Sequence, residues 1–312
     1  MRRRRGAAAA VLVAALLAGC AAEPGRAGDA GAAAPRPTGP PRSSTTTGAP
    51  GEPALPDRDT RPVAAGDPAG LAAQLATAAR AIADAGSSGE ELGRAGHLQQ
   101  VAVAALAARP DWDGAVAAAL PAGTRDAVAL DVGAVRELAA LVRRPRATLP
   151  AWRIRPPPAP EVLRRHYAEG EAATGVPWTL LAAVHLVETR MSRIEGDSSA
   201  GAQGPMQFLP STWSAYGEGD IHDTRDAILG AARFLAASGA PEDPYQALLR
   251  YNPTPRYARS VAAFAARMAA DERAFLGYHG WEVHYRTTLG DVWLRPGYDA
   301  EAERPVTGND LG

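Results

Sequence analysis

One segment of the 312-residue chain restricts the possible folds more than any other. Residues 177–190 read PWTLLAAVHLVETR, and between Leu180 and Val187 only His185 is polar. Pro177 stands where a helix tolerates proline, in its first turn. Because a helix that is apolar nearly all round must be buried on every side, we predict a mainly α-helical fold built around this segment.

Glu188 lies on the last turn of this predicted helix. Its neighbours one and two turns back, Val184 and Leu181, are apolar, and the negative end of the helix dipole is close. Desolvation and the dipole both favour the neutral carboxyl and raise its pKa. A carboxyl that stays protonated near neutral pH can act as a general acid, so Glu188 is the predicted catalytic residue.

Two other roles for Glu188 are compatible with the sequence. The side chain can turn to solvent at the helix end and pair with Arg190 or Arg193. Alternatively, His185 and Glu188, three residues apart, can supply half of a metal site. No second histidine stands at a matching spacing, so we predict neither a bound metal nor any other cofactor.

The composition restricts the possible functions. Hydrophobic residues make up 46% of the chain, which is enough for a real core, although many are alanines that favour helix and bury little area. The net charge of −1 argues against nucleic acid as a partner. Cys20 is the one cysteine, so the chain cannot form an internal disulfide.

The N-terminal region has the pattern of an export signal and a tether. MRRRRG is followed by a short apolar run and by Leu17-Ala18-Gly19-Cys20, which resembles a bacterial lipobox. That resemblance implies a signal peptide and lipobox over residues 1–20 and a lipid anchor on Cys20 that holds the protein to the outer side of the cell membrane. The alternative is an ordinary secretory signal in which the cysteine is incidental. Residues 21–66, rich in alanine, glycine and proline, predict a disordered tether.

Residues 67–149 predict a small helical module. Four helical patterns are present, with cap signals at Asp67 and at Ser88 with Glu91. No group of catalytic residues stands out, and we interpret His97 as a surface or capping residue. The module is a candidate for binding protein partners.

A proline-rich hinge, RRPRATLPAWRIRPPPAP, separates this module from residues 150–276, the predicted catalytic domain. Over residues 277–312 apolar and polar residues alternate on both sides of a turn signal, Leu289-Gly290-Asp291. This pattern predicts a short C-terminal β-hairpin.

The residues after Glu188 resemble a known enzyme signature. In order, they are Glu188-Thr189, a loop with the pattern S-x-x-G-A, the pattern G-x-M-Q-x-x-P-x-T within GAQGPMQFLPSTW, and Tyr251-Asn252. Together they resemble lytic transglycosylases of the soluble-transglycosylase, lysozyme-like superfamily over about residues 160–268. Ala227, Pro205 and Pro253 depart from the common pattern and are closer to its membrane-bound transglycosylase B branch.

The resemblance implies a lysozyme-like catalytic domain that cleaves peptidoglycan glycan strands without hydrolysis. Glu188 protonates the oxygen between N-acetylmuramic acid and the next N-acetylglucosamine, and the muramic acetamido group attacks the anomeric carbon. The ionised Glu188 then takes the proton of the sugar's 6-hydroxyl, which closes a 1,6-anhydro ring. The lipid-anchored enzyme then faces the cell wall.

The resemblance also implies a set of substrate-binding residues. Gln207 offers a donor and an acceptor to sugar groups, and Gly201 and Gly204 let the backbone approach the ring. Ser198 contacts Glu188 or the acetamido group, or else it only shapes a turn. Met206 and Phe208 are expected to hold Gln207 from either side while also belonging to the core. Tyr251 is expected to orient Glu188 or the intermediate, and Asn252 to cap the adjacent loop. The last two, Tyr257 and Trp213, either line the glycan groove or pack in the core.

Two competing functions remain open from the sequence. In a lysozyme-type hydrolase, Glu188 acts as the acid and Asp197 or Glu195 from the following loop activates a water molecule. In the other, the protein is an inactive glycan-binding scaffold. The presence of Glu188 within its motif argues against the scaffold.

Overall fold

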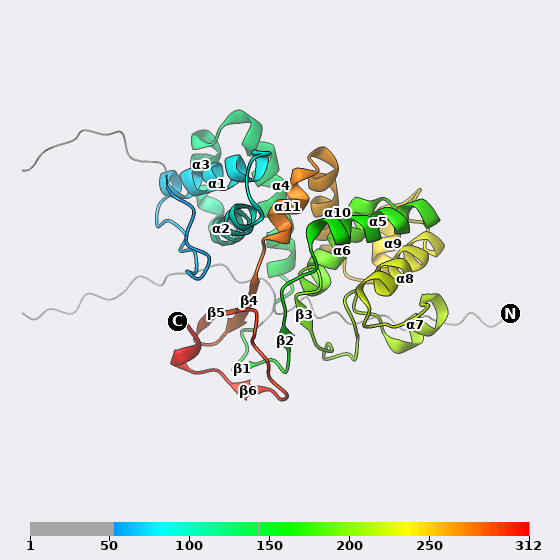
Figure 1. The fold of residues 1–312 in the computed structure, drawn as a ribbon. Helices are drawn as coiled ribbons and strands as arrows, with labels where there is room; N and C mark the ends of the chain where they lie inside the picture. The colour runs from blue at the N-terminus through cyan, green and yellow to red at the C-terminus, as the bar shows by residue number, and fades with distance from the viewer. Residues whose placement is uncertain (1–52, 143, 312) are drawn as a thin grey trace, which may run out of the picture.

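A computed structural model describes residues 53–142 and 144–311 (Figure 1). In this part of the chain the protein has eleven α-helices and three two-stranded antiparallel sheets, so the predicted mainly α-helical class is confirmed. Within the described ranges, no helix is both long enough and apolar enough to cross a membrane. The predicted signal peptide with Cys20, and residues 21–52 of the predicted tether, lie outside the described residues.

The elements follow one another along the chain with short connections. The helices are α1 (Pro68–Ala83), α2 (Gly89–Ala107), α3 (Asp113–Ala119), α4 (Ala122–Ala139), α5 (Pro160–Thr174), α6 (Trp178–Thr189), α7 (Pro210–Tyr216), α8 (Thr224–Ala237), α9 (Pro244–Tyr251), α10 (Pro255–Ala270) and α11 (Arg273–His279). The strands are β1 (Thr148–Leu149), β2 (Arg153–Ile154), β3 (Ile194–Glu195), β4 (Val283–Thr287), β5 (Gly290–Leu294) and β6 (Arg304–Pro305), with short 3₁₀ helices η2 (Pro110–Trp112) and η3 (Gly308–Leu311).

The cap signals read from the sequence are present at the first two helices. The Asp67 side chain accepts a hydrogen bond from the Gly70 N–H at 2.9 Å, and Pro68 occupies the first turn of α1. Ser88 and Glu91 form a reciprocal capping box at the start of α2. These bonds satisfy amide groups that the first turn of a helix leaves without partners.

Helix α6 is the central element, as its apolar sequence predicts. All of its residues, Trp178 to Thr189, are buried. It contacts α5, α8, α10 and α11, so apolar side chains are required on every face. Its first turn follows Pro177, and the preceding helix ends at Gly175, whose φ of 75° suits glycine.

The two helical regions share one apolar core. In Figure 1, α1–α4 lie on one side and α5, α7, α8 and α9 on the other, with α6, α10 and α11 between them. Helix α4 packs on α10, and α2 packs on α11. Glu137 of α4 also accepts hydrogen bonds from Arg256 (3.0 Å) and Arg259 (2.7 Å) of α10. Residues of both regions belong to a single buried cluster.

The strands enclose a second, smaller apolar cluster. It includes Trp152, Ile154 and Ile194 together with side chains of β4 and β5. The predicted C-terminal hairpin is present, but its turn lies at residues 288–289, earlier than expected. Thr287 closes this turn, because its hydroxyl donates to the Gly290 carbonyl (2.6 Å) and accepts from the Leu289 N–H (3.2 Å).

Two local expectations differ from the structure. His97 is buried instead of exposed or capping, and its Nε2 lies 2.8 Å from His284 Nε2 of the hairpin. Residues 53–66 of the predicted tether lie in the described part and contact the fold: Gln74 is hydrogen-bonded to the backbone at Val63 and Ala65. His284 lies 187 residues from His97, and residues 53–66 follow no helical or strand periodicity, so the sequence carries no local signal for either contact.

Helices α2 and α11 approach too closely for a side chain at Gly96. A Cβ there would lie 2.1 Å from the Gly277 carbonyl oxygen. We expect Gly96→Ala to reduce the free energy of unfolding by about 1–3 kcal/mol. Gly133 of α4 is exposed, and nothing lies within 4 Å of its Cβ position. Gly133→Ala should therefore increase the free energy of unfolding by about 0.5–1 kcal/mol. Urea denaturation of both variants tests this, and equal effects would contradict the close packing.

Candidate active site

The carboxyl of Glu188 is buried at the end of α6. The residue is 1% exposed, because the helix is surrounded by other helices. The Tyr257 hydroxyl of α10 donates a hydrogen bond to Glu188 Oε1 at 2.6 Å. Among the described residues, Oε2 has no hydrogen-bond partner. The two oxygens are therefore different: one is held by a phenol and the other is the natural place for a proton.

Burial raises the pKa of Glu188 to about 8, and the hydrogen bond from Tyr257 offsets only part of that rise. At neutral pH the carboxyl is therefore predominantly protonated and can donate a proton. The exposed alternative is wrong: the described residues contain no ion pair between Glu188 and either arginine. Arg193 pairs with Glu282, and the Arg190 guanidinium donates to the Leu186 carbonyl.

The metal alternative also lacks support in the geometry. Both ring nitrogens of His185 already have partners: Nδ1 lies 2.8 Å from the Tyr167 hydroxyl, and Nε2 lies 2.8 Å from the Ser192 hydroxyl. Burial lowers the pKa of His185 to about 3, so the ring is neutral. Within residues 53–142 and 144–311, no group of three or more His, Cys, Asp or Glu side chains could hold a metal ion.

The turn that follows Glu188 is strained. Arg190, Met191 and Ser192 have φ values of 54°, 59° and 69°, which is the left-handed region. Such a conformation costs a non-glycine residue roughly 1–3 kcal/mol. The contact between His185 and Ser192 stabilises the turn, as does a hydrogen bond from the Met191 N–H to the His185 carbonyl (3.2 Å). The sequence contains no glycine that could have indicated this turn.

The loop with Gln207 folds against itself. Gln207 has a φ of 48°, and its Nε2 donates to the carbonyls of Gly204 (3.0 Å) and Gly196 (3.3 Å). Its Oε1 is buried and has no partner in the part of the chain that the structure describes. The side-chain donor thus holds the loop, and only the acceptor remains for another molecule.

The two glycines of this loop have different surroundings. Gly204 has a φ of 70°, and a Cβ there would lie 1.9 Å from the Ile221 carbonyl oxygen. Gly201 has a φ of 78° and nothing within 4 Å of its Cβ position. Gly204 is therefore required by contact with the protein's own chain, whereas we expected it to admit a sugar ring.

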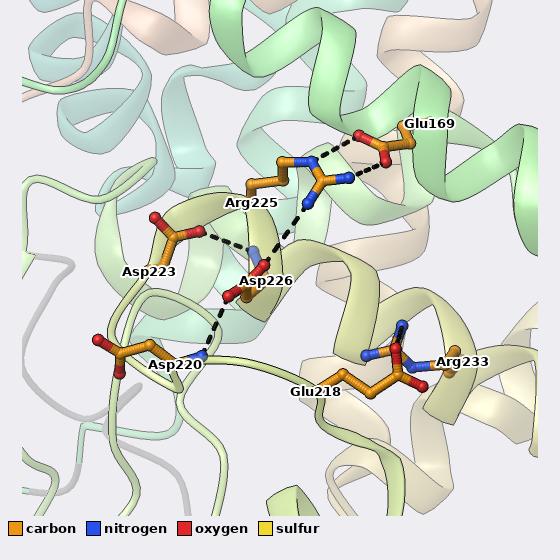
Figure 2. Close-up of polar contacts among 7 residues, drawn as sticks. All are labelled: Glu169, Glu218, Asp220, Asp223, Arg225, Asp226 and Arg233. Carbon is orange, nitrogen blue, oxygen red and sulfur yellow. Dashed lines mark hydrogen bonds and ion pairs between the residues drawn. The ribbon is translucent and has the colours of Figure 1, made fainter.

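The segment opposite Gly204 is held by ion pairs and a hydrogen bond (Figure 2). Arg225 of α8 pairs with Glu169 of α5, and the Asp226 carboxylate accepts a hydrogen bond from the Asp220 N–H at 3.0 Å. Because the arginine and glutamate are 47% and 42% exposed, the ion pair contributes at most about 1 kcal/mol. The hydrogen bond from the Asp220 N–H to Asp226, next to Ile221 in sequence, is the contact that holds this segment against α8.

Neither tyrosine has the contact that we expected. Tyr251, expected to orient Glu188, donates its phenol to the Met206 carbonyl at 2.5 Å. Tyr257, expected to be core or a groove wall, contacts Glu188. The sequence could have indicated this only through spacing, since Tyr257 lies on the first turn of α10, which packs on α6.

The remaining residues of the predicted site have structural contacts. Met206 and Phe208 are core, and Trp213 is half-buried against Phe208. The Ser198 hydroxyl accepts from the N–H groups of residues 200 and 202 (3.2 and 2.9 Å), so it shapes a turn and does not contact Glu188. Asn252 Oδ1 accepts from the Thr254 N–H at 3.2 Å and caps the loop after α9.

A cavity of about 660 Å³ adjoins this loop. Ser192, Gly204 and Pro205 form one part of its wall, next to the end of α6. The Thr189 hydroxyl, adjacent to Glu188, donates to the Pro205 carbonyl at 2.6 Å, which connects the helix end to this wall. The Glu188 carboxyl is not exposed in the cavity, so a ligand must displace covering atoms to reach it.

Two curated proteins are similar to part of this chain. Membrane-bound lytic murein transglycosylase F of Thiobacillus denitrificans is 33% identical over 98 residues, which are 29% of this chain and 21% of that protein. Membrane-bound lytic murein transglycosylase F 2 of Alkalilimnicola ehrlichii is 32% identical over 100 residues, which are 32% of this chain and 20% of that protein.

The similarity is distant and partial. The chain spans about a fifth of the length of these relatives. No protein-family model matches it. No solved structure matches it either. The relatives carry the F name, so the resemblance to the B branch remains a prediction.

The raised pKa of Glu188 makes stability depend on pH. The native state keeps the proton up to about pH 8, whereas the unfolded chain releases it near its ordinary value of 4.5. The free energy of unfolding should therefore fall by roughly a few kcal/mol as pH rises from 4.5 to about 8. Glu188→Gln cannot ionise and should lack this slope.

Chemical denaturation between pH 4 and pH 9 measures the effect. The exposed Glu242→Gln is the control and should keep the wild-type slope. Identical slopes for wild type and Glu188→Gln would show that the carboxyl ionises normally.

Proposed function

We propose that this protein is a peptidoglycan lytic transglycosylase. Its reaction is the non-hydrolytic cleavage of the β-1,4 bond between N-acetylmuramic acid and N-acetylglucosamine, with 1,6-anhydro ends as products. The observation that carries the proposal is the buried Glu188 carboxyl, whose Oε1 is held by Tyr257 while Oε2 has no partner among the described residues. The partial similarity to two lytic murein transglycosylases supports the same reaction class.

The chemistry follows from the state of the carboxyl. Glu188 enters the reaction protonated and gives its proton from Oε2 to the glycosidic oxygen. Once ionised in an apolar site, the carboxylate is a stronger base than an exposed one and takes the proton of the 6-hydroxyl. The Tyr257 phenol stabilises the ionised form through its hydrogen bond and so limits the energetic cost of the intermediate state.

The cavity beside the loop is the proposed position of the glycan strand. Its wall contains Gly204 and Pro205, and Pro205 is hydrogen-bonded to Thr189 beside Glu188. Binding must then shift the covering atoms so that a sugar oxygen can reach Oε2. Gln207 Oε1, buried without a partner in residues 53–142 and 144–311, is the acceptor that we propose for a substrate N–H or O–H group.

The hydrolase alternative requires a second carboxylate. Asp197 and Glu195 are exposed; Asp197 accepts from Gln203 at 3.4 Å, and Glu195 pairs with Arg155 at 3.4 Å. Neither carboxylate bonds Glu188, whose Oε1 accepts a hydrogen bond from Tyr257. This arrangement favours a single-carboxylate reaction.

We also propose that the protein is exported and anchored to the cell membrane through Cys20, facing the cell wall. The lipobox pattern supports the anchor, and both relatives are named membrane-bound. Cys20 lies outside the described residues. Mass spectrometry of the purified N-terminus tests the modification.

Product analysis tests the reaction. Mass spectrometry of digested peptidoglycan should find anhydro-muropeptides, whereas reducing-end muropeptides would favour hydrolysis and no digestion would favour a scaffold. Glu188→Gln should retain the fold and lose activity by at least about 10² to 10⁴, the usual contribution of a general acid. Asp197→Asn should change the rate little, and a comparable loss there would support the hydrolase.

The two tyrosines should affect the pH profile differently. Activity requires the protonated acid, so kcat/KM should fall above about pH 8. The Tyr257 hydrogen bond lowers the pKa of Glu188, so Tyr257→Phe should move this upper limit to higher pH and reduce kcat. Tyr251→Phe removes a hydrogen bond to Met206 instead, so it should leave the upper limit in place. Equal shifts in both variants would contradict the assignment.

A further inference from the structure

The chain that follows Glu188 runs between two cavities. Ser192 and Ile194 contribute to the cavity beside the catalytic loop, whereas Arg193 contributes to a second cavity of about 630 Å³. The backbone of this segment therefore separates the two cavities. Residues 56–62, α2, the end of α11 and β5 form the other walls of the second cavity.

A buried ion pair in the wall of this second cavity is incompletely satisfied. Arg193 Nη1 lies 3.3 Å from Glu282 Oε1, and the side chains are 8% and 16% exposed. Arg193 Nη2 donates to the His279 carbonyl at 2.9 Å. In the described part of the chain, Arg193 Nε and Glu282 Oε2 are both buried without a hydrogen-bond partner. The ion pair therefore keeps one unused donor on Arg193 and one unused acceptor on Glu282. Burying both atoms without partners costs free energy.

Two further donors of the cavity wall are in the same state. Trp293 Nε1 of β5 and Arg94 Nε of α2 are buried and make no hydrogen bond to any described residue. Native proteins leave few buried polar groups without partners, so four of them along one wall point to a ligand. The four atoms are covered from solvent, so the ligand must displace covering atoms to bond them. The volume is within the range of small-molecule sites.

The charges of the wall are balanced. The lining contains four arginines and four carboxylates: Arg58, Arg94, Arg193, Arg295, Asp57, Asp59, Glu90 and Glu282. The two histidines of the wall, His97 and His279, add no charge, because burial lowers the pKa of both rings. A balanced wall does not favour a polyanion such as a nucleic acid or polyphosphate, and it suits a ligand that carries both signs.

We propose that this cavity binds the head group of an α-amino acid, with its carboxylate and its ammonium on one carbon. The carboxylate accepts from Arg193 Nε and from the Trp293 or Arg94 N–H, and the ammonium donates to Glu282 Oε2. The closeness of Arg193 and Glu282 requires that the two ligand charges also be close. This site goes beyond the proposed function and does not depend on it. The head group can belong to a free amino acid or to the side chain of a diamino acid in a cell-wall peptide.

Isothermal titration calorimetry of the folded protein with defined probes tests the site. Alanine and meso-diaminopimelate carry the complete head group, and both should bind. N-acetylalanine lacks the ammonium and alaninamide lacks the carboxylate, so each should bind at least about tenfold more weakly. Tighter binding of diaminopimelate than of alanine identifies the peptide as the source, and equal binding identifies the free amino acid.

Variants of the wall separate this site from other binding. Trp293→Phe keeps the ring and removes one donor, so affinity for alanine should fall about tenfold. Glu282→Gln removes the charge and should have at least that effect, although loss of a buried ion pair can also disturb folding. Trp112 stacks with Arg109 and lies outside the cavity wall, so Trp112→Phe is the matched control. This variant should bind alanine with wild-type affinity.

Any of three results would overturn the proposal: alanine and diaminopimelate do not bind, N-acetylalanine binds as tightly as alanine, or Trp293→Phe binds alanine with wild-type affinity. Glu188→Gln should bind these probes normally, because Glu188 is not in this cavity wall. Loss of catalysis and loss of amino-acid binding can therefore be distinguished.

Discussion

Keeping a carboxyl protonated at neutral pH requires that water be excluded from it on every side. In this protein the exclusion depends on α6, which has no exposed residue, and on the contact between Tyr257 and Glu188 Oε1. Helix α10 carries that tyrosine and packs on α6 and on α4. The position of the phenol is thus determined by helices from both halves of the chain.

This arrangement gives the N-terminal helices a structural role. Glu137 of α4 accepts hydrogen bonds from Arg256, directly before Tyr257, and from Arg259, two residues after it. These ion pairs are half-exposed and contribute modestly to stability, in addition to the packing of α10 on α4. The close approach of α2 and α11 at Gly96 adds a second connection. The helical module therefore supports the candidate site without contributing a residue to it.

Much of the fold could be predicted from local patterns. The caps at Asp67 and Ser88 and the apolar sequence of α6 predicted elements that are present, because these signals are encoded within a few residues. The burial of Glu188 also followed from its place on an apolar helix. The burial of His97 could not be predicted, since its partner His284 lies 187 residues away.

The candidate site was predicted less completely. The signature placed Glu188, Gln207 and Tyr251 in one region, but it did not include Tyr257, the tyrosine that contacts the carboxyl from α10. The left-handed turn at residues 190–192 carries no glycine, and the Ser192 hydroxyl within it lies 3.0 Å from the hydroxyl of the distant Thr224, so no local pattern indicates the turn. Likewise, Gly204 is required by a carbonyl seventeen positions away, at Ile221.

The central claim is that Glu188 keeps its proton near neutral pH. The carboxyl ¹³C resonances of protein labelled at glutamate, recorded from pH 3 to pH 10 and assigned by comparison with Glu188→Gln, measure this directly. The account predicts a midpoint near pH 8 for Glu188. A midpoint near the ordinary glutamate value of 4.5 would contradict it.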